Sequence, residues 1–181
     1  FFYTLPFSKN KALIETTWFS NLEDQSLMDY DLQLENYIKN NLGIKNYKIN
    51  FTERGAIPLF HPLNKNNKKT VYIGSAGGMT RLSTGYTFLN IQEHSKYIVE
   101  NIDKIEKIKM YNIGKKYQFL DKIFLRVLKN NPDKMPKIFF EMFKASSSCV
   151  IKFLSNKSNI FEDINIIGRM PKLIFMRALF H

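Results

Sequence analysis

The chain has 181 residues, of which 44% are hydrophobic and 24% are charged, so it is long enough to bury a core and its composition is that of a folded protein. A single cysteine, Cys149, cannot form an intrachain disulfide, and we expect a reducing, cytoplasmic setting. Because the chain has only three histidines, which are scattered along the sequence, we expect no metal site. The formal net charge is +11, and 16 of the 27 lysines and arginines follow residue 100. Such a basic region could bind nucleic acid or an anionic membrane surface; alternatively, the lysines only keep the protein soluble.

The N-terminal third of the chain predicts two strands, a helix and a further strand. Residues 1–6 and 12–19 are β-rich and a short polar segment separates them, which indicates two antiparallel strands joined by a turn. Apolar residues at helical spacing predict a helix over 27–42, with Gly43 as its C-terminal cap. Alternation of apolar and polar residues over 47–53 predicts a half-buried strand.

A run rich in small residues, 74–86, follows a short apolar segment. Residues 71–73 predict a buried strand, and the glycines after it permit close approach of the backbone to a flat ligand. Ser83 or Thr84 is expected to cap a long helix that continues past residue 97. A helix N-terminus aimed at a ligand favours negative charge, such as that of a phosphate or a reduced flavin. A plain turn that binds nothing stays open as the alternative.

Beyond residue 112 only short helical patterns remain, so we expect one region over 1–112 and a helical cap region over 113–181. Two helical faces are predicted there: Tyr117, Leu120, Ile123, Phe124, Val127 and Leu128 on the first, and Met135, Ile138, Phe139, Met142 and Phe143 on the second. Ser147 or Ser148 is expected to cap a third helix, and Pro171 suits the first turn of a last one. The aromatic and Met-rich faces of these helices indicate either an ordinary hydrophobic core or an apolar entrance to a binding site with lysines and arginines around it.

The segments 3–8, 12–17, 53–59 and 74–86 stand in an order and at distances that resemble the lycopene cyclase family of flavoproteins, nearest to the bacterial lycopene β-cyclases. Members of that family begin with a dinucleotide-binding Gly-x-Gly-x-x-Gly signature, which this sequence does not contain. The resemblance therefore implies the C-terminal part of a two-domain, FAD-dependent flavoprotein of mixed α and β (α+β) structure. Its expected parts are an antiparallel substrate-side sheet, a flavin-contacting strand-turn-helix and a helical C-terminal cap. Exposed apolar area is expected where an N-terminal half would pack.

The resemblance assigns a catalytic role to Glu15. On the sequence pattern alone, Glu15 reads as a solvent-facing carboxylate on a sheet. In the family the matching strand carries an acidic motif, usually two carboxylates followed by Thr, in which a glutamate is implicated in acid–base catalysis. Here the second carboxylate is replaced by Thr16. A carboxyl group buried against hydrocarbon has a raised pKa and can protonate a terminal double bond of a linear carotene near neutral pH.

The resemblance also implies a cofactor site and a substrate pocket. Reduced FAD, with NAD(P)H as its reductant, is expected against Gly74, Ala76, Gly77, Gly78, Met79, Thr80, Ser83, Thr84 and Gly85. Glu53, Pro58 and Tyr86 are expected to line the substrate pocket. The chain departs from the family at Arg81-Leu82, where many cyclases have His-Pro; a basic residue at this position still suits an anionic flavin.

The implied function is non-redox cyclisation of the ends of lycopene to β-rings, by a protein of which these residues alone are inactive. The expected partners are lycopene, the N-terminal half of the same protein, and the surface of the inner membrane, contacted peripherally because no segment approaches the roughly twenty apolar residues that span a bilayer. Two alternatives stay open: an FAD-dependent oxidoreductase, monooxygenase or isoprenoid reductase, and a basic membrane-binding domain without activity. A nucleic-acid partner is not expected, because the basic residues are dispersed.

Overall fold

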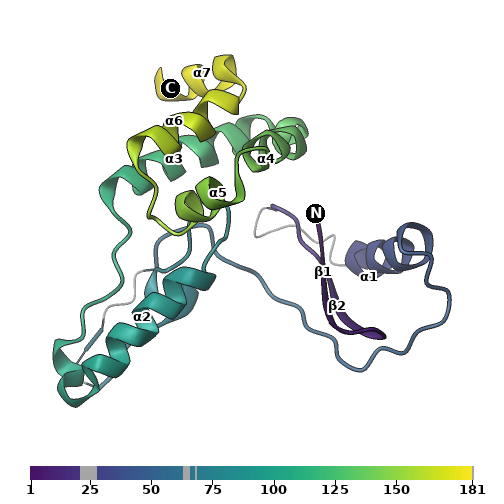
Figure 1. The fold of residues 1–181 in the computed structure, drawn as a ribbon, viewed down its shortest axis with the longest axis horizontal. Helices are drawn as coiled ribbons and strands as arrows, with labels where there is room; N and C mark the ends of the chain where they lie inside the picture. Colours follow the sequence, from purple (N-terminus) through teal and green to yellow (C-terminus); the bar gives the residue numbers. More distant parts are fainter. Residues whose placement is uncertain (21–27, 63–65, 68, 181) are drawn as a thin grey trace. The chain divides into compact units, whose positions relative to one another are not determined.

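The computed structural model describes residues 1–20, 28–62, 66–67 and 69–180 (Figure 1). The chain divides into two compact units, Phe1–Arg54 (the N-terminal unit) and Gly55–His181 (the C-terminal unit). Among the described residues these units contain helices and one two-stranded antiparallel sheet, so the expected mixture of α and β structure is confirmed. The division expected after residue 112 stays a prediction.

The N-terminal unit begins with the predicted hairpin. Strands β1 (Phe2–Ser8) and β2 (Lys11–Thr16) pair antiparallel, with Leu5 opposite Leu13. The polar residues between the strands form the turn, as the sequence indicated.

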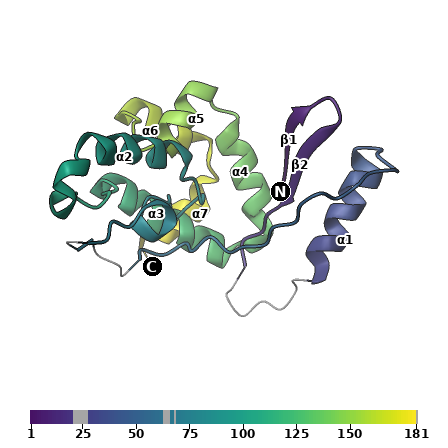
Figure 2. The same cartoon turned by 90° about the horizontal axis from the view of Figure 1, so that it is seen from below.

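A helix packs beside this hairpin (Figure 2). Helix α1 (Met28–Asn36) continues into a π-helical turn, η1 (Tyr37–Asn41), and Gly43 follows with φ of +68°. The predicted helix and its glycine cap are therefore confirmed, except that residue 27 lies outside the described residues. The ring of Tyr37 stacks on that of Phe2 with centroids 4.1 Å apart.

The described part of the N-terminal unit has no fully buried residue. Phe7, Ile49 and Phe51 are 66–69% exposed, so the exposed apolar area expected from the sequence is present. The strand predicted over 47–53 is wrong: these residues form no strand and are exposed. A strand needs a hydrogen-bonding neighbour, and the described residues provide none for this segment.

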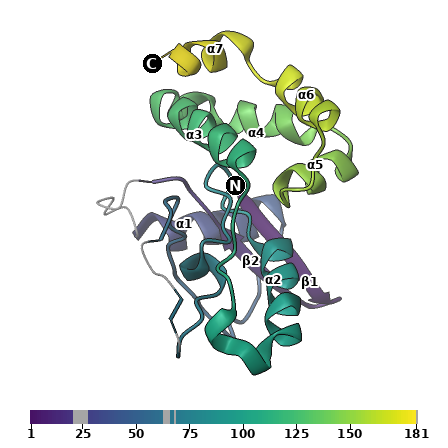
Figure 3. The ribbon, with the colours of Figure 1, turned by 90° about the vertical axis from the view of Figure 1, so that its left-hand side faces the viewer.

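The helices and turns of the C-terminal unit are joined by irregular segments, and its described residues form no strand beyond an isolated bridge between Asn67 and Thr70. Its elements are η2 (Gly74–Gly77), α2 (Phe88–Glu100), η3 (Ile102–Lys107), α3 (Lys115–Asn130), η4 (Pro132–Lys134), α4 (Met135–Phe143), α5 (Ser147–Leu154), α6 (Ile160–Arg169) and α7 (Lys172–Phe180). Figure 3 shows α3 to α7 gathered in the upper part of the view, with α2 below them. No helix of the described residues is both long enough and apolar enough to cross a membrane.

The core lies among α3 to α7. Helix α3 contacts α7, and α4, α5 and α6 contact one another. Val127, Ile138, Met142 and Ile166 are fully buried there, because each comes from the apolar face of its helix. The helical faces predicted for α3 and α4 supply three of these four side chains.

Three expectations for this unit are corrected by the structure. Residues 71–73 form no strand, again without a neighbouring strand in the described residues. Helix α2 begins at Phe88 instead of near Ser83, and no side chain caps it. The cap of α5 is Ser146, one residue earlier than predicted, and it accepts a hydrogen bond from the backbone N–H of Cys149.

Helix α6 was not predicted from the sequence. Its sequence signal is a capping box: the side chain of Asn159 accepts from the N–H of Glu162, and Glu162 accepts from the N–H of Asn159. This reciprocal pattern satisfies two N–H groups at the start of a helix.

Candidate functional site

The glycine-rich run forms a tight 3₁₀ turn, η2, at the start of the predicted site. Gly77 tolerates no side chain, because a Cβ there would lie 2.4 Å from the carbonyl oxygen of Tyr72. Gly78 ends the turn with φ of +75°, a conformation that glycine adopts without strain. The chain therefore requires glycine at both positions, in agreement with the close backbone approach predicted from the sequence.

The N–H groups of this turn are bonded within it. Gly77, Gly78 and Met79 donate to the carbonyl oxygens of residues 73, 75 and 74, each over 3.1 Å. The turn therefore presents a surface on which the N–H groups of residues 77–79 are not free donors. The expected helix N-terminus facing a ligand is also absent here, since α2 begins only at Phe88.

A pocket of about 310 Å³ opens beside this surface. Gly77 and Gly78 line one side of it, and His61, Tyr111 and Gln118 are among the residues that line the rest. Polar and apolar groups share the lining, which suits a ligand with both kinds of surface.

A second pocket of about 420 Å³ shares His61 and Gln118 with the first. Lys115 and Lys122 of α3 line it together with the apolar Leu82, Phe119 and Leu125. The two pockets therefore adjoin, and the second carries positive charge. An anionic ligand with an apolar portion fits this combination.

Several predicted cofactor residues lie in the interior instead of on the pocket wall. Met79, Thr80 and Ser83 are all less than 4% exposed. The Thr80 hydroxyl donates to Ser75 Oγ over 3.0 Å, and Met79 O accepts from the Asn90 side chain over 2.8 Å. They hold the turn in place, and their direct contact with a cofactor stays a prediction.

The end of the run is a second tight turn. Gly85 has φ of +72° and donates to the carbonyl of Arg81 over 2.8 Å, while the N–H of Arg81 donates to the carbonyl of Tyr86. Thr84 Oγ1 accepts from the N–H of Tyr86 over 3.3 Å. Gly74 and Ala76 lie in the first turn, where Gly74 is half-buried and Ala76 is exposed.

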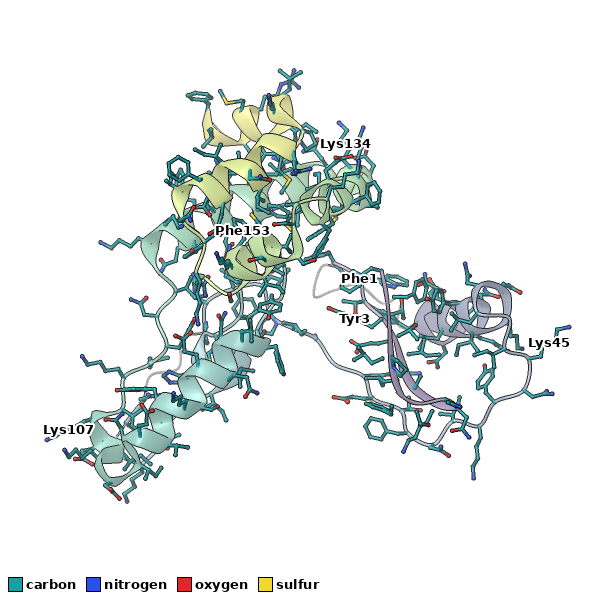
Figure 4. The ribbon with its side chains drawn as sticks, viewed as in Figure 1. Phe1, Tyr3, Lys45, Lys107, Lys134 and Phe153 are labelled. Atoms are coloured by element: carbon teal, nitrogen blue, oxygen red, sulfur yellow. The ribbon has the colours of Figure 1, made fainter. Side chains whose placement is uncertain are left out.

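A buried ion pair ties these turns to the helices. Arg81 is fully buried, and its Nε donates to both carboxylate oxygens of Asp121 on α3, at 3.1 and 3.0 Å. A second guanidinium nitrogen donates to the carbonyl of Phe153 on α5, and the guanidinium carbon lies 5.0 Å from the centre of the Phe153 ring. Phe153 is labelled in Figure 4. Each nitrogen of the guanidinium thus has an acceptor in the protein, and the expectation that Arg81 suits an anionic flavin stays a prediction.

Asp121 also accepts hydrogen bonds from other residues of the run 74–86. Its carboxylate accepts from the backbone N–H of Leu82 over 3.1 Å and from the Ser83 hydroxyl over 2.7 Å. Asp121 was not predicted from the sequence, although a signal was present. Asp121 falls between Tyr117 and Phe124 on the apolar face of α3, and a carboxylate on a buried face requires a charged or hydrogen-bonding partner.

A second cluster of polar side chains lies next to the first turn. Asn90 and His94 of α2 meet Tyr111 and Asn156 here: the Asn156 side chain donates to Asn90 Oδ1 and to the Tyr111 hydroxyl, at 3.3 and 3.2 Å. Burial lowers the pKa of His94 below its ordinary value. The Nε2 atom of His94 and Oδ1 of Asn156 have no hydrogen-bond partner among the described residues.

The predicted acid lies in the other unit. Glu15 stands on β2 opposite Tyr3 and is exposed, and its Oε1 accepts from the Thr17 hydroxyl over 3.4 Å. Glu53 is also exposed, whereas Pro58, in the C-terminal unit, is half-buried. Glu15 and Glu53 thus belong to the N-terminal unit, and Pro58, Tyr86 and the glycine turns to the C-terminal unit.

Comparison with protein families identifies the chain. The family described as lycopene cyclase protein matches residues 1–180. The chain belongs to the lycopene cyclase family. The resemblance drawn from four sequence segments is therefore confirmed, and it extends over the helical C-terminal region that those segments do not include.

A plant relative supports this membership. The lycopene beta cyclase, chloroplastic/chromoplastic, of Narcissus pseudonarcissus is 37% identical over 87 residues, which are 48% of this chain and 17% of that protein. The match thus spans about a sixth of the length of the curated relative. No solved structure matches the chain.

Proposed function

We propose that this chain forms part of an enzyme that cyclises the ends of lycopene to β-rings. The family match over residues 1–180 carries the proposal, and the relative from Narcissus bears the name of that activity. Cyclisation is an isomerisation: a proton adds to a terminal double bond, a neighbouring double bond attacks the resulting carbocation, and a proton leaves the new ring. Atoms and electrons balance without net oxidation or reduction.

Glu15 is the proposed proton donor. A carboxylic acid that donates a proton near neutral pH needs a raised pKa, which apolar surroundings produce by disfavouring the charged form. The exposed position of Glu15 on β2 gives it access to a substrate. Apolar surroundings then arise when the hydrocarbon itself, or another part of the protein, covers this face of the hairpin.

The pockets beside the glycine turn are the proposed contact with FAD. Gly77 and Gly78 line the first pocket without side chains, which would leave room for one face of a flat ring, and Lys115 and Lys122 fit an anionic group at the second. These pockets together offer room for part of FAD. The cofactor, reduced by NAD(P)H, would supply negative charge next to the carbocation.

The substitution Glu15→Gln tests the acid. In the full-length protein, produced in cells that accumulate lycopene, we expect cyclised carotene to fall at least about a hundredfold, the lower range of a general acid's contribution. Extracted carotenoids are measured by chromatography. Asp29→Asn, which neutralises another exposed carboxylate of the same unit, is the matched control and should leave the product unchanged.

Cyclised product at the native rate in Glu15→Gln would contradict the assignment of Glu15. Reductant use tests the reaction class separately. A cyclase consumes no NAD(P)H in proportion to its product, so one equivalent consumed per product molecule would favour an oxidoreductase of similar architecture.

A further inference from the structure

The two faces of the N-terminal hairpin differ in what covers them. Alternate residues of a strand lie on the same face of a sheet. On one face the ring of Phe2 stacks on that of Tyr37 in η1, and the Thr16 hydroxyl donates to the side chain of Gln33 in α1 over 3.4 Å. Glu15 precedes Thr16 in the strand and therefore lies on the other face. Its carboxyl group is exposed there, on the side that these contacts leave open.

Aromatic and aliphatic side chains surround Glu15 on this open face. The register of the strands places Tyr3 opposite Glu15 and Leu5 opposite Leu13. Tyr3 and Leu5 are 48% and 49% exposed. The ring of Phe1 meets that of Tyr3 in a T-shaped contact with centroids 5.2 Å apart, and Figure 4 labels both residues. We call this face the acid face, and it consists of Phe1, Tyr3, Leu5, Leu13, Glu15 and Thr17.

The ring of Tyr3 and the carboxyl group of Glu15 share the same space. Residues directly opposite each other in an antiparallel pair have Cβ atoms about 4.5–5.5 Å apart. Glu15 forms no ion pair within the described residues, so no cation of these residues is bound beside the two side chains. The π face of a tyrosine ring attracts a positive charge that lies within about 6 Å of its centre. An acid and a group that attracts cations therefore stand side by side.

The proposed cyclisation creates a positive charge at this place. The proton of the Glu15 carboxyl adds to the terminal double bond, whose electron pair forms the new C–H bond and leaves a cation on the adjoining carbon. The electron pair of a neighbouring double bond then closes the ring and moves the charge into it. Loss of a ring proton to the Glu15 carboxylate forms the ring double bond and restores the acid. The charge therefore arises close to the oxygen atom that gave the proton.

We propose that Tyr3 is a further catalytic residue, whose ring stabilises the carbocation formed when Glu15 donates its proton. A group that favours the charge developing in the transition state lowers the barrier. Tyr3 does so from the same face as the acid, in addition to the negative charge proposed for the cofactor. The inference rests on the proposed cyclisation and on Glu15 as its acid.

Two substitutions of Tyr3 test the ring separately from its hydroxyl. In the full-length protein, produced in cells that accumulate lycopene, Tyr3→Leu should lower cyclised carotene roughly ten- to thirtyfold, the effect of losing a desolvated cation–π contact. Tyr3→Phe keeps the ring and should stay within about threefold of the unmodified protein. Tyr47→Leu replaces a tyrosine of the same unit that is 42% exposed and lies outside the hairpin. This matched control should leave the product unchanged.

The position of the double bond in the product ring provides a second measurement. A carbocation that is held less firmly loses its proton from other carbons, so Tyr3→Leu should raise the fraction of rings whose double bond is displaced. A side chain with a structural role alone would lower all cyclised products in proportion. Chromatography and absorption spectra distinguish the ring isomers. Circular dichroism and thermal unfolding verify that each variant folds.

Three outcomes would overturn the role of Tyr3. The first is a folded Tyr3→Leu protein with the native yield, or with a lower yield but an unchanged ratio of ring isomers. The second is an equal loss in Tyr3→Phe, because the hydroxyl would then be responsible. The third is an equal loss in Tyr47→Leu.

Glu15→Gln separates this inference from the proposed function. If Glu15→Gln loses the product while Tyr3→Leu keeps it, the role of Tyr3 fails and the acid stands. If Glu15→Gln makes the product at the native rate, the acid fails, and the inference that depends on it fails with it.

Discussion

Single residues decide how the glycine turns are held. Arg81 and Asp121 are buried and paired, and Asp121 also bonds to two neighbours of Arg81 in the chain. The sequence showed a departure from the family at Arg81 and suggested a role toward flavin. In the structure the basic side chain points into the protein, where the carboxylate of Asp121, 40 residues away in the chain, pairs with it.

The substitution Asp121→Asn should destabilise the C-terminal unit strongly. It leaves the guanidinium of Arg81 buried without a counter-charge, which costs about 3–5 kcal/mol in the free energy of unfolding. Urea unfolding followed by circular dichroism measures the change.

The exposed pair of Glu93 and Lys157 provides the control for Asp121→Asn. These side chains lie 3.3 Å apart and are more than half exposed, so Glu93→Gln should cost at most about 1 kcal/mol. Equal effects of Asp121→Asn and Glu93→Gln would show that the buried pair does not hold the unit together.

At the scale of elements, the helices were more predictable than the strands outside the hairpin. Apolar periodicity predicted α1, α3 and α4 because each helix satisfies its own backbone hydrogen bonds. The segments 47–53 and 71–73 have strand-like sequences but form no strand, because a strand depends on a neighbour that the segment does not encode. The glycine turn was correctly located, since its glycines are required by the local backbone.

Two glycine substitutions with opposite expected effects test this view of the turn. Gly77→Ala places a Cβ 2.4 Å from the Tyr72 carbonyl oxygen and should lower the free energy of unfolding by roughly 1–3 kcal/mol. Gly168→Ala in α6 meets no atom within 4 Å and should raise it by about 0.5–1 kcal/mol, because alanine favours a helix. Denaturant unfolding compares both variants. A stable Gly77→Ala protein with an unchanged turn would contradict the close approach described here.

At the scale of the whole molecule, the chain forms two units that meet in sequence at Arg54 and Gly55. From the sequence we expected a boundary after residue 112, where helical patterns replace a mixture of strand and helix patterns. The structure places residues 80–83 and 121 in one hydrogen-bonded cluster, so contacts cross the predicted boundary.

Limited proteolysis of the native protein distinguishes these two boundaries. Residues 46–60 are without regular structure and 46–57 are exposed, so trypsin should cleave first near Lys48 or Arg54, and later at Lys115 or Lys116 at the start of α3. Mass spectrometry of early fragments identifies the sites. First cleavage after Lys115 would favour the division at 112.

The sequence by itself determined the family, the hairpin, most of the helices and the glycine turn, because local patterns specify each of these. Only the tertiary structure decided that Arg81 turns inward to Asp121, that Met79, Thr80 and Ser83 are interior, and that α6 and α7 leave an apolar surface exposed. These properties depend on which faces meet across the fold. A face that periodicity marks as apolar becomes core only if another element covers it, and nothing within residues 160–180 specifies which faces are covered.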